Sequence, residues 1–126
     1  MASAIKSFRD LIAWQKAIEF CKQVYAVSTA FPDSERFGLT SQIRRAVVSI
    51  PSNIAEGYGR RRTKDYLRFL DVAHGSLCEV ETQLVLSSEL GFTNPSSVGT
   101  CMELVHEVDR ILNALVQAVR QSATRY

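Results

Sequence analysis

Apolar residues recur at spacings of three and four along most of the chain, which is the periodicity of one face of an α-helix. Short segments containing proline or glycine separate four such stretches. The pattern therefore predicts helices over about 10–30, 35–57, 64–90 and 95–121. Four amphipathic helices with short connections pack as antiparallel neighbours, so we expect one domain over residues 1–126. Its predicted fold is all-α, an antiparallel up-and-down four-helix bundle.

Each predicted helix carries one apolar stripe that we expect to face the core. In the first helix the stripe consists of Leu11, Trp14, Ile18, Cys21 and Tyr25. In the second it consists of Leu39, Ile43, Val47, Ile50 and Ile54. In the third it consists of Tyr66, Leu70, Ala73, Leu77, Val80 and Leu84. In the fourth it consists of Val98, Cys101, Val105, Val108, Leu112, Leu115 and Val119.

Turn residues place the ends of these helices. Phe31 precedes Pro32, which disfavours helical backbone at Phe31, so the second helix is expected to begin near Glu35. Thr63 is the predicted cap of the third helix, because a threonine side chain accepts from free backbone N–H groups. Gly91 is its predicted end.

The second helix contains an internal proline, which predicts a kink or a split. Pro51 lacks a backbone N–H and clashes with the carbonyl of the residue four positions earlier, at a cost of about 3 kcal/mol if nothing compensates. We expect Ser49, Ser52 or Asn53 to satisfy the freed backbone groups, and Gly57 to stop the helix. Such breaks of local rules mark a structural device or a site. The structural motif predicted here consists of Ser49, Pro51, Asn53, Glu56 and Gly57.

Composition places the chain among ordinary globular proteins, since 46% of its 126 residues are hydrophobic and 22% are charged. No apolar run approaches the roughly 18–20 residues that span a bilayer. Lys6, Arg9 and Asp10 interrupt any signal-peptide core. We therefore expect a cytoplasmic protein that does not contact a membrane.

The sequence carries no motif of nucleophilic catalysis, phosphate binding or dinucleotide binding. The three cysteines form no C-x-x-C pair and are interpreted as small buried hydrophobic residues. Asp71-x-x-His74 and Glu103-x-x-His106, with Glu19 and Glu56, have the composition of a di-iron site, but these pairs lie beside the apolar stripes instead of on them. We expect no enzyme, no metal and no cofactor.

The net charge of +2 conceals a segregation of charge along the chain. Residues 36–68 contain eight Lys and Arg against two acidic residues, a net +6. Residues 69–109 contain seven Asp and Glu and no Lys or Arg, a net −7. Such a distribution binds an anionic partner on one surface, or lets identical subunits dock basic face to acidic face.

The run from Arg60 to Lys64 is the sharpest electrostatic feature. Arginine presents several donors to phosphate oxygens, and Tyr58 and Tyr66 offer aromatic rings on which a base can stack. The simpler alternatives are a solvated loop and salt bridges between subunits. The candidate nucleic-acid-binding residues are Arg44, Arg45, Arg60, Arg61, Arg62, Lys64 and Arg68.

Several segments resemble the four-helix-bundle family encoded in intervening sequences of bacterial 23S rRNA genes, also labelled S23 ribosomal protein. The most specific segment is SIPSNIAEG, from Ser49 to Gly57, within Gln42 to Gly57. The other matching segments are Phe8-Arg9-Asp10-Leu11, Trp14, Phe31-Pro32, Phe37-Gly38-Leu39, Asp65-Tyr66-x-x-Phe69 and Gly75-Ser76-Leu77-x-Glu79-x-x-x-Gln83-Leu84. The resemblance covers roughly residues 8–119.

This resemblance implies an antiparallel four-helix bundle that assembles as a ring of five subunits, with no known enzymatic activity. Relatives include the accessory variability protein of diversity-generating retroelements, a basic pentamer that looks to bind nucleic acid and a reverse transcriptase. The accessory proteins are generally more basic than this chain. From the resemblance and the basic run together, we expect a homopentamer that binds RNA or DNA non-specifically through a basic surface. The alternative is a protein–protein scaffold or accessory subunit whose basic segment is used for subunit contacts.

Overall fold

The structure is a computed structural model that describes residues 4–124, and within that range every regular element is helical. The four long helices are α1 (Ile12–Ser28), α2 (Leu39–Tyr58), α3 (Thr63–Glu89) and α4 (Pro95–Thr124). Two short 3-10 turns, Phe8–Asp10 and Asp33–Glu35, precede α1 and α2. The predicted all-α fold is confirmed.

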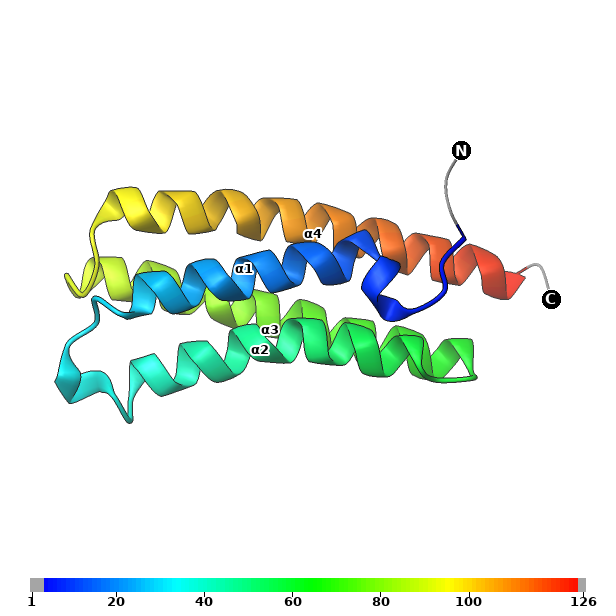
Figure 1. The fold of residues 1–126 in the computed structure, drawn as a ribbon, viewed down its shortest axis with the longest axis horizontal. Coiled ribbons are helices and arrows are strands. Elements are labelled where there is room, and N and C mark those ends of the chain that lie inside the picture. The colour runs from blue at the N-terminus through cyan, green and yellow to red at the C-terminus, as the bar shows by residue number, and fades with distance from the viewer. Residues whose placement is uncertain (1–3, 125–126) are drawn as a thin grey trace.

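The helices form a square bundle with alternating chain direction (Figure 1). Close backbone contacts join α1 to α2, α2 to α3, α3 to α4 and α4 to α1, and among residues 4–124 they join neither diagonal pair. The connection from α2 to α3 lies at the same end as the start of α1 and the end of α4 (Figure 1). Residues far apart in sequence therefore meet at that end. Among the described residues, no helix is long and apolar enough to cross a membrane.

The predicted stripes of the last three helices supply most of the core. All five predicted α2 positions are buried, and so are the α3 and α4 positions except Tyr66 and Leu115, which are partly buried. One further α4 residue, Leu104, is also buried. Burial of an apolar face is the main contribution to stability that a bundle of this size has.

The buried face of α1 differs from the predicted one. Its core residues are Ala13, Ala17, Phe20, Val24 and Val27. Trp14, Ile18 and Cys21 lie partly buried at the margin, and Tyr25 is exposed. The helix carries two neighbouring apolar stripes. The stripe containing the two alanines faces inward because small side chains let α1 approach its neighbours closely.

The start of α2 was predicted four residues too early. Asp33–Glu35 forms a separate 3-10 turn, and α2 begins at Leu39. The Glu35 side chain accepts a hydrogen bond from the Leu39 N–H at 3.1 Å, so Glu35 caps the helix from outside. A Cβ at Gly38 would lie 2.9 Å from the Glu35 carboxylate oxygen. The capping carboxylate therefore occupies the space beside Gly38.

The helix α2 continues through Pro51, so the predicted alternative of a split helix is wrong. The alternative of a kink stays a prediction. The proline leaves the Val47 carbonyl without its usual helical donor. The Cys21 thiol of α1 donates to that carbonyl at 3.2 Å. The compensating donor therefore comes from a neighbouring helix instead of Ser49, Ser52 or Asn53.

Of the other motif residues, Ser49 and Gly57 lie against α3. Asn53 Nδ2 donates to the Ser49 carbonyl at 2.7 Å, and the hydroxyls of Ser49 and Ser76 lie 2.7 Å apart. Gly57 is buried and does not end the helix, which continues to Tyr58. A Cβ at Gly57 would lie 2.9 Å from the Phe69 Cβ, so the glycine lets α3 approach α2 closely. Glu56 is exposed on the outer surface.

The two ends of α3 have different origins. Thr63 is the first helical residue and not the cap; the cap position is Arg62, whose side chain makes no capping hydrogen bond. Gly91 ends the helix as predicted, with φ of 75°. The Phe92 N–H donates to the Ser87 carbonyl at 2.8 Å and the Gly91 N–H to the Ser88 carbonyl at 3.0 Å, a Schellman arrangement that requires the left-handed glycine.

Candidate nucleic-acid interface

The seven basic candidate residues fall into two groups separated along the bundle. Arg44 and Arg45 lie in the first half of α2, whereas the other five lie at the connection from α2 to α3 and at the start of α3. At 1.5 Å per helical residue, the two groups are about 20 Å apart. The structure therefore does not join them into one patch.

The larger group gains a residue from α4. Lys64, Arg68 and Arg120 line one shallow surface groove, and all three side chains are exposed. Arg120 lies more than fifty positions after Arg68 in the chain, so no local motif indicates it. The antiparallel arrangement, which places the end of α4 beside the start of α3, was the signal that could have found it. We call Arg60, Arg61, Arg62, Lys64, Arg68 and Arg120 the basic end.

Few carboxylates neutralise the basic end. Within residues 4–124, the ion pair formed there joins Arg68 to Asp65 at 3.5 Å, both on α3. No carboxylate of the described residues lies within 4.0 Å of the guanidinium groups of Arg60, Arg61 and Arg62 or of the Lys64 ammonium. Asp65 and Asp71 share the groove of Lys64. An excess of exposed positive charge remains.

The aromatic rings of this end are already engaged within the bundle. The guanidinium carbons of Arg60 and Arg68 lie 4.6 and 5.9 Å from the centre of the Phe69 ring. Tyr58 and Tyr66 are partly buried and meet edge to face with ring centres 6.3 Å apart. Burial, with a smaller contribution from Tyr58, raises the pKa of Tyr66 to about 12. Both tyrosines therefore stabilise the junction of α2 and α3.

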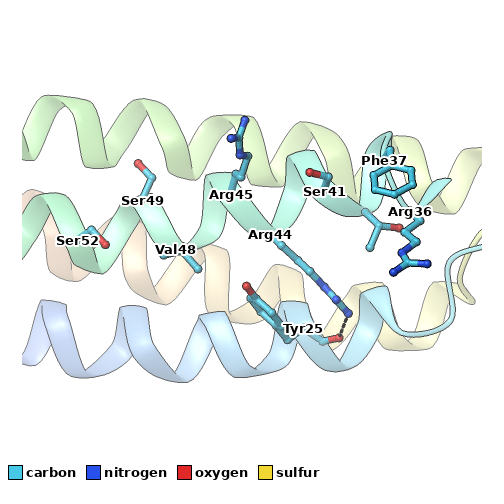
Figure 2. Close-up of a pocket in the computed structure, with 10 residues that line it drawn as sticks. Tyr25, Arg36, Phe37, Ser41, Arg44, Arg45, Val48, Ser49 and Ser52 are labelled. Carbon is cyan, nitrogen blue, oxygen red and sulfur yellow. Dashed lines mark hydrogen bonds between the residues drawn. The ribbon is translucent and has the colours of Figure 1, made fainter.

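The smaller basic group borders a shallow groove of about 610 Å³ along α2 (Figure 2). Its lining includes Arg36, Phe37, Arg44, Arg45 and Val48, and no acidic residue. The Phe37 side chain is 90% exposed. In Figure 2, Arg44 points towards α1 whereas Arg45 points away from it.

Arg44 has structural partners. Its Nε donates to the Ser28 hydroxyl at 2.8 Å and its Nη2 to the Tyr25 carbonyl at 3.3 Å. Its guanidinium carbon lies 4.7 Å from the centre of the Tyr25 ring. Ser28 ends α1, so Arg44 joins the last turn of α1 to α2. Arg45 makes no such contact and is exposed.

The acidic residues of the second charge block are spread over α3 and α4. Glu107 pairs with Lys16 at 3.1 Å, and Asp109 Oδ1 lies 2.9 Å from His74 Nε2. Glu79, Glu89 and Glu103 are exposed. In the part of the chain that the structure describes, no three His, Cys, Asp or Glu side chains gather as metal ligands would.

The four-helix bundle of this chain is also found in known proteins. A family model described as 23S rRNA-intervening sequence protein matches residues 9–114. A crystal structure of a protein with unknown function from the S23 ribosomal protein family of Bacteroides thetaiotaomicron superimposes with a TM-score of 0.77 at 20% identity, covering 83% of this chain and 98% of that one. At that identity the likeness shows a shared fold. No curated protein matches this chain. Because the family model spans most of its length, the chain belongs to the 23S rRNA-intervening sequence protein family.

Proposed function

We propose that this protein is a non-enzymatic, homopentameric nucleic-acid-binding protein that holds RNA, in preference to DNA, non-specifically through its basic end. The observation that carries the proposal is the concentration of six exposed cationic side chains at one end of the bundle, with one ion pair to a described carboxylate among them. The ring of five subunits is supported by the family resemblance and by the segregation of charge.

The binding mechanism is electrostatic. Each Lys or Arg that neutralises a phosphate releases condensed counterions, which makes the affinity fall steeply with salt concentration. Arg61 and Arg62 are exposed in the connection between α2 and α3, so their guanidinium groups reach phosphates without leaving a partner in the bundle. Repetition around a ring would multiply weak contacts into useful avidity.

Native mass spectrometry of the purified protein with a short structured RNA, over a range of ammonium acetate concentrations, tests this proposal. We expect a five-subunit mass that gains RNA at low ionic strength and loses it as salt rises. Arg61→Ala/Arg62→Ala should weaken binding across all RNA sequences. It should make the slope of log K against log salt shallower by about one to two for each engaged subunit.

The matched control is Lys22→Ala/Arg110→Ala, which removes the same charge from α1 and α4 away from the basic end. Affinity that is equal at low and high salt, or that falls equally in both double variants, contradicts RNA binding at the basic end. A monomeric mass contradicts the ring.

The second candidate function is a protein–protein scaffold whose basic end makes the subunit contacts. The opposite charges of residues 36–68 and 69–109 favour it. Charge reversal at Arg60, Arg61 and Arg62 should then dissociate the ring. Retention of a ring by that triple variant would count against this alternative.

A further inference from the structure

No other helix of residues 4–124 covers the outer faces of α2 and α3. Among their charged residues, Glu79 accepts a hydrogen bond from Gln83 at 3.3 Å and Arg68 pairs with Asp65 at 3.5 Å. The α2 face, as defined here, consists of Arg36 and Phe37, just before the helix, and Arg45, Val48, Ser52 and Glu56 within it. The α3 face consists of Arg68, Val72, Gly75, Glu79, Leu86 and Glu89. All twelve residues are exposed. The four α2 residues from Arg45 to Glu56 are spaced by three or four positions, and the α3 residues by three, four or seven, so each of these sets follows one side of its helix.

Contacts within the chain give the relative heights of these residues along the bundle. Gln83 Nε2 lies 3.4 Å from Gln42 Oε1, and Ser49 and Ser76 are hydrogen-bonded at 2.7 Å. Since α2 and α3 are antiparallel, every step forward on α2 matches a step backward on α3. Arg36 therefore lies at the height of Glu89, Arg45 at that of Glu79, and Glu56 at that of Arg68.

The order of charge along the two faces is complementary. Passing down the α2 face, the charges are positive at Arg36 and Arg45 and negative at Glu56. At the same heights, the α3 face is negative at Glu89 and Glu79 and positive at Arg68, and the exposed Asp71, one turn after Arg68, adds a further negative charge. Rotation about an axis parallel to the bundle keeps every height, so it brings each charge of the α2 face opposite its counterpart on the α3 face of a neighbour.

Apolar and small residues fill the space between these charges. Val48 is 41% exposed, Val72 49% and Leu86 44%. Apart from its chain neighbours and the backbone of its own helix, no described atom lies within 4 Å of a Cβ added at Gly75, so this glycine weakens the interior of α3 without serving packing inside the bundle. Gly75 lies at the height of the short side chains around Ser52, where two helices can approach closely.

We infer that the α2 face of one copy docks on the α3 face of a second copy, in parallel orientation, and that this contact builds the ring on which the proposed function rests. In a square bundle the outward directions of α2 and α3 differ by about a quarter turn, so successive copies would be related by about a quarter turn and the contact closes a ring instead of growing a filament. A ring of five copies needs a rotation of about 72° between copies, a deviation of about 18° from the quarter turn. The contact leaves Arg60, Arg61, Arg62 and Lys64 free for nucleic acid.

Charge reversal on each face, alone and together, tests the contact. Arg36→Glu/Arg45→Glu and Glu79→Arg/Glu89→Arg should each weaken association by about a hundredfold or more, measured by sedimentation velocity. The quadruple variant carries both reversals and should recover the ring. Lys22→Glu/Arg110→Glu is the control for a change of net charge, and circular dichroism checks that every variant is folded.

The possible outcomes are distinct. A wild-type ring that either double variant leaves intact, or that the quadruple variant fails to restore, overturns this assignment of faces while the ring itself stands. A monomeric wild type overturns both the contact and the proposed assembly, and leaves the two faces for a different protein.

Discussion

At the scale of single residues, the hydrogen bond between Cys21 and the Val47 carbonyl explains how α2 tolerates Pro51. Burial raises the pKa of the Cys21 thiol to about 11, so the thiol keeps its proton at neutral pH and acts as the donor. The motif is thus completed by a residue of another helix.

We predict that Cys21→Val destabilises the protein by about 1–3 kcal/mol, because it leaves the Val47 carbonyl without a partner. In a Pro51→Ala background, the alanine N–H supplies the missing helical bond, so the same change should cost much less. Urea unfolding of the four chains of this double-mutant cycle measures the difference. Additive effects would show that the thiol does not compensate for the proline.

The raised pKa of Tyr66 predicts that the stability of the protein decreases at alkaline pH. The folded pKa of Tyr66, about 12, lies above the ordinary value of 10.0. The stabilising contribution of the neutral hydroxyl is therefore complete below pH 10 and is lost as the pH rises towards 12. Melting temperatures should fall more steeply over this interval for the wild type than for Tyr66→Phe. Parallel curves would assign the alkaline loss to other groups.

At the scale of elements, two glycines of similar helical setting have opposite expected effects. Gly57→Ala places a Cβ 2.9 Å from the Phe69 Cβ and should cost about 1–3 kcal/mol, since overpacking separates α2 from α3. Gly75→Ala meets nothing within the chain and should stabilise the isolated subunit by about 1 kcal/mol through helix propensity. Urea unfolding at dilutions that keep the subunit monomeric measures both, and effects of the same sign would contradict this packing.

The junction of α1 and α2 gives a second prediction at this scale. Arg44→Ala removes two hydrogen bonds and the contact with Tyr25, and should cost about 1–2 kcal/mol of unfolding free energy. Arg45→Ala is the matched control and should change subunit stability by less than about 0.5 kcal/mol. Thermal unfolding compares the two, and equal losses would remove the distinction between them.

At the scale of the whole molecule, RNA binding and assembly should differ in their response to salt. In the proposed function RNA is held by exposed charges alone, whereas the proposed contact between copies also buries Phe37, Val48 and Leu86. Rising salt should therefore release RNA before the ring dissociates. Sedimentation velocity with labelled RNA follows both events, and dissociation of the ring at the lower salt concentration would contradict a partly apolar contact.

The candidate site was predictable only in part. The arginine run is visible in the sequence because its members are consecutive. Arg120 joins it only because α4 returns beside α3. Arg44 looked equivalent to Arg45, yet it is bound to the end of α1. Side-chain partners of this kind come from other helices, and periodicity carries no information about them.

The periodicity of apolar residues is enough to predict the four helices and the buried faces of α2, α3 and α4, because one strong apolar stripe in each leaves a single orientation. On α1 two neighbouring stripes compete, and only packing against the other helices selected Ala13, Ala17 and Phe20 for the core. The tertiary structure likewise decided the donor for Val47 and the separation of the basic groups. These features depend on distances between helices, which a one-dimensional pattern does not contain.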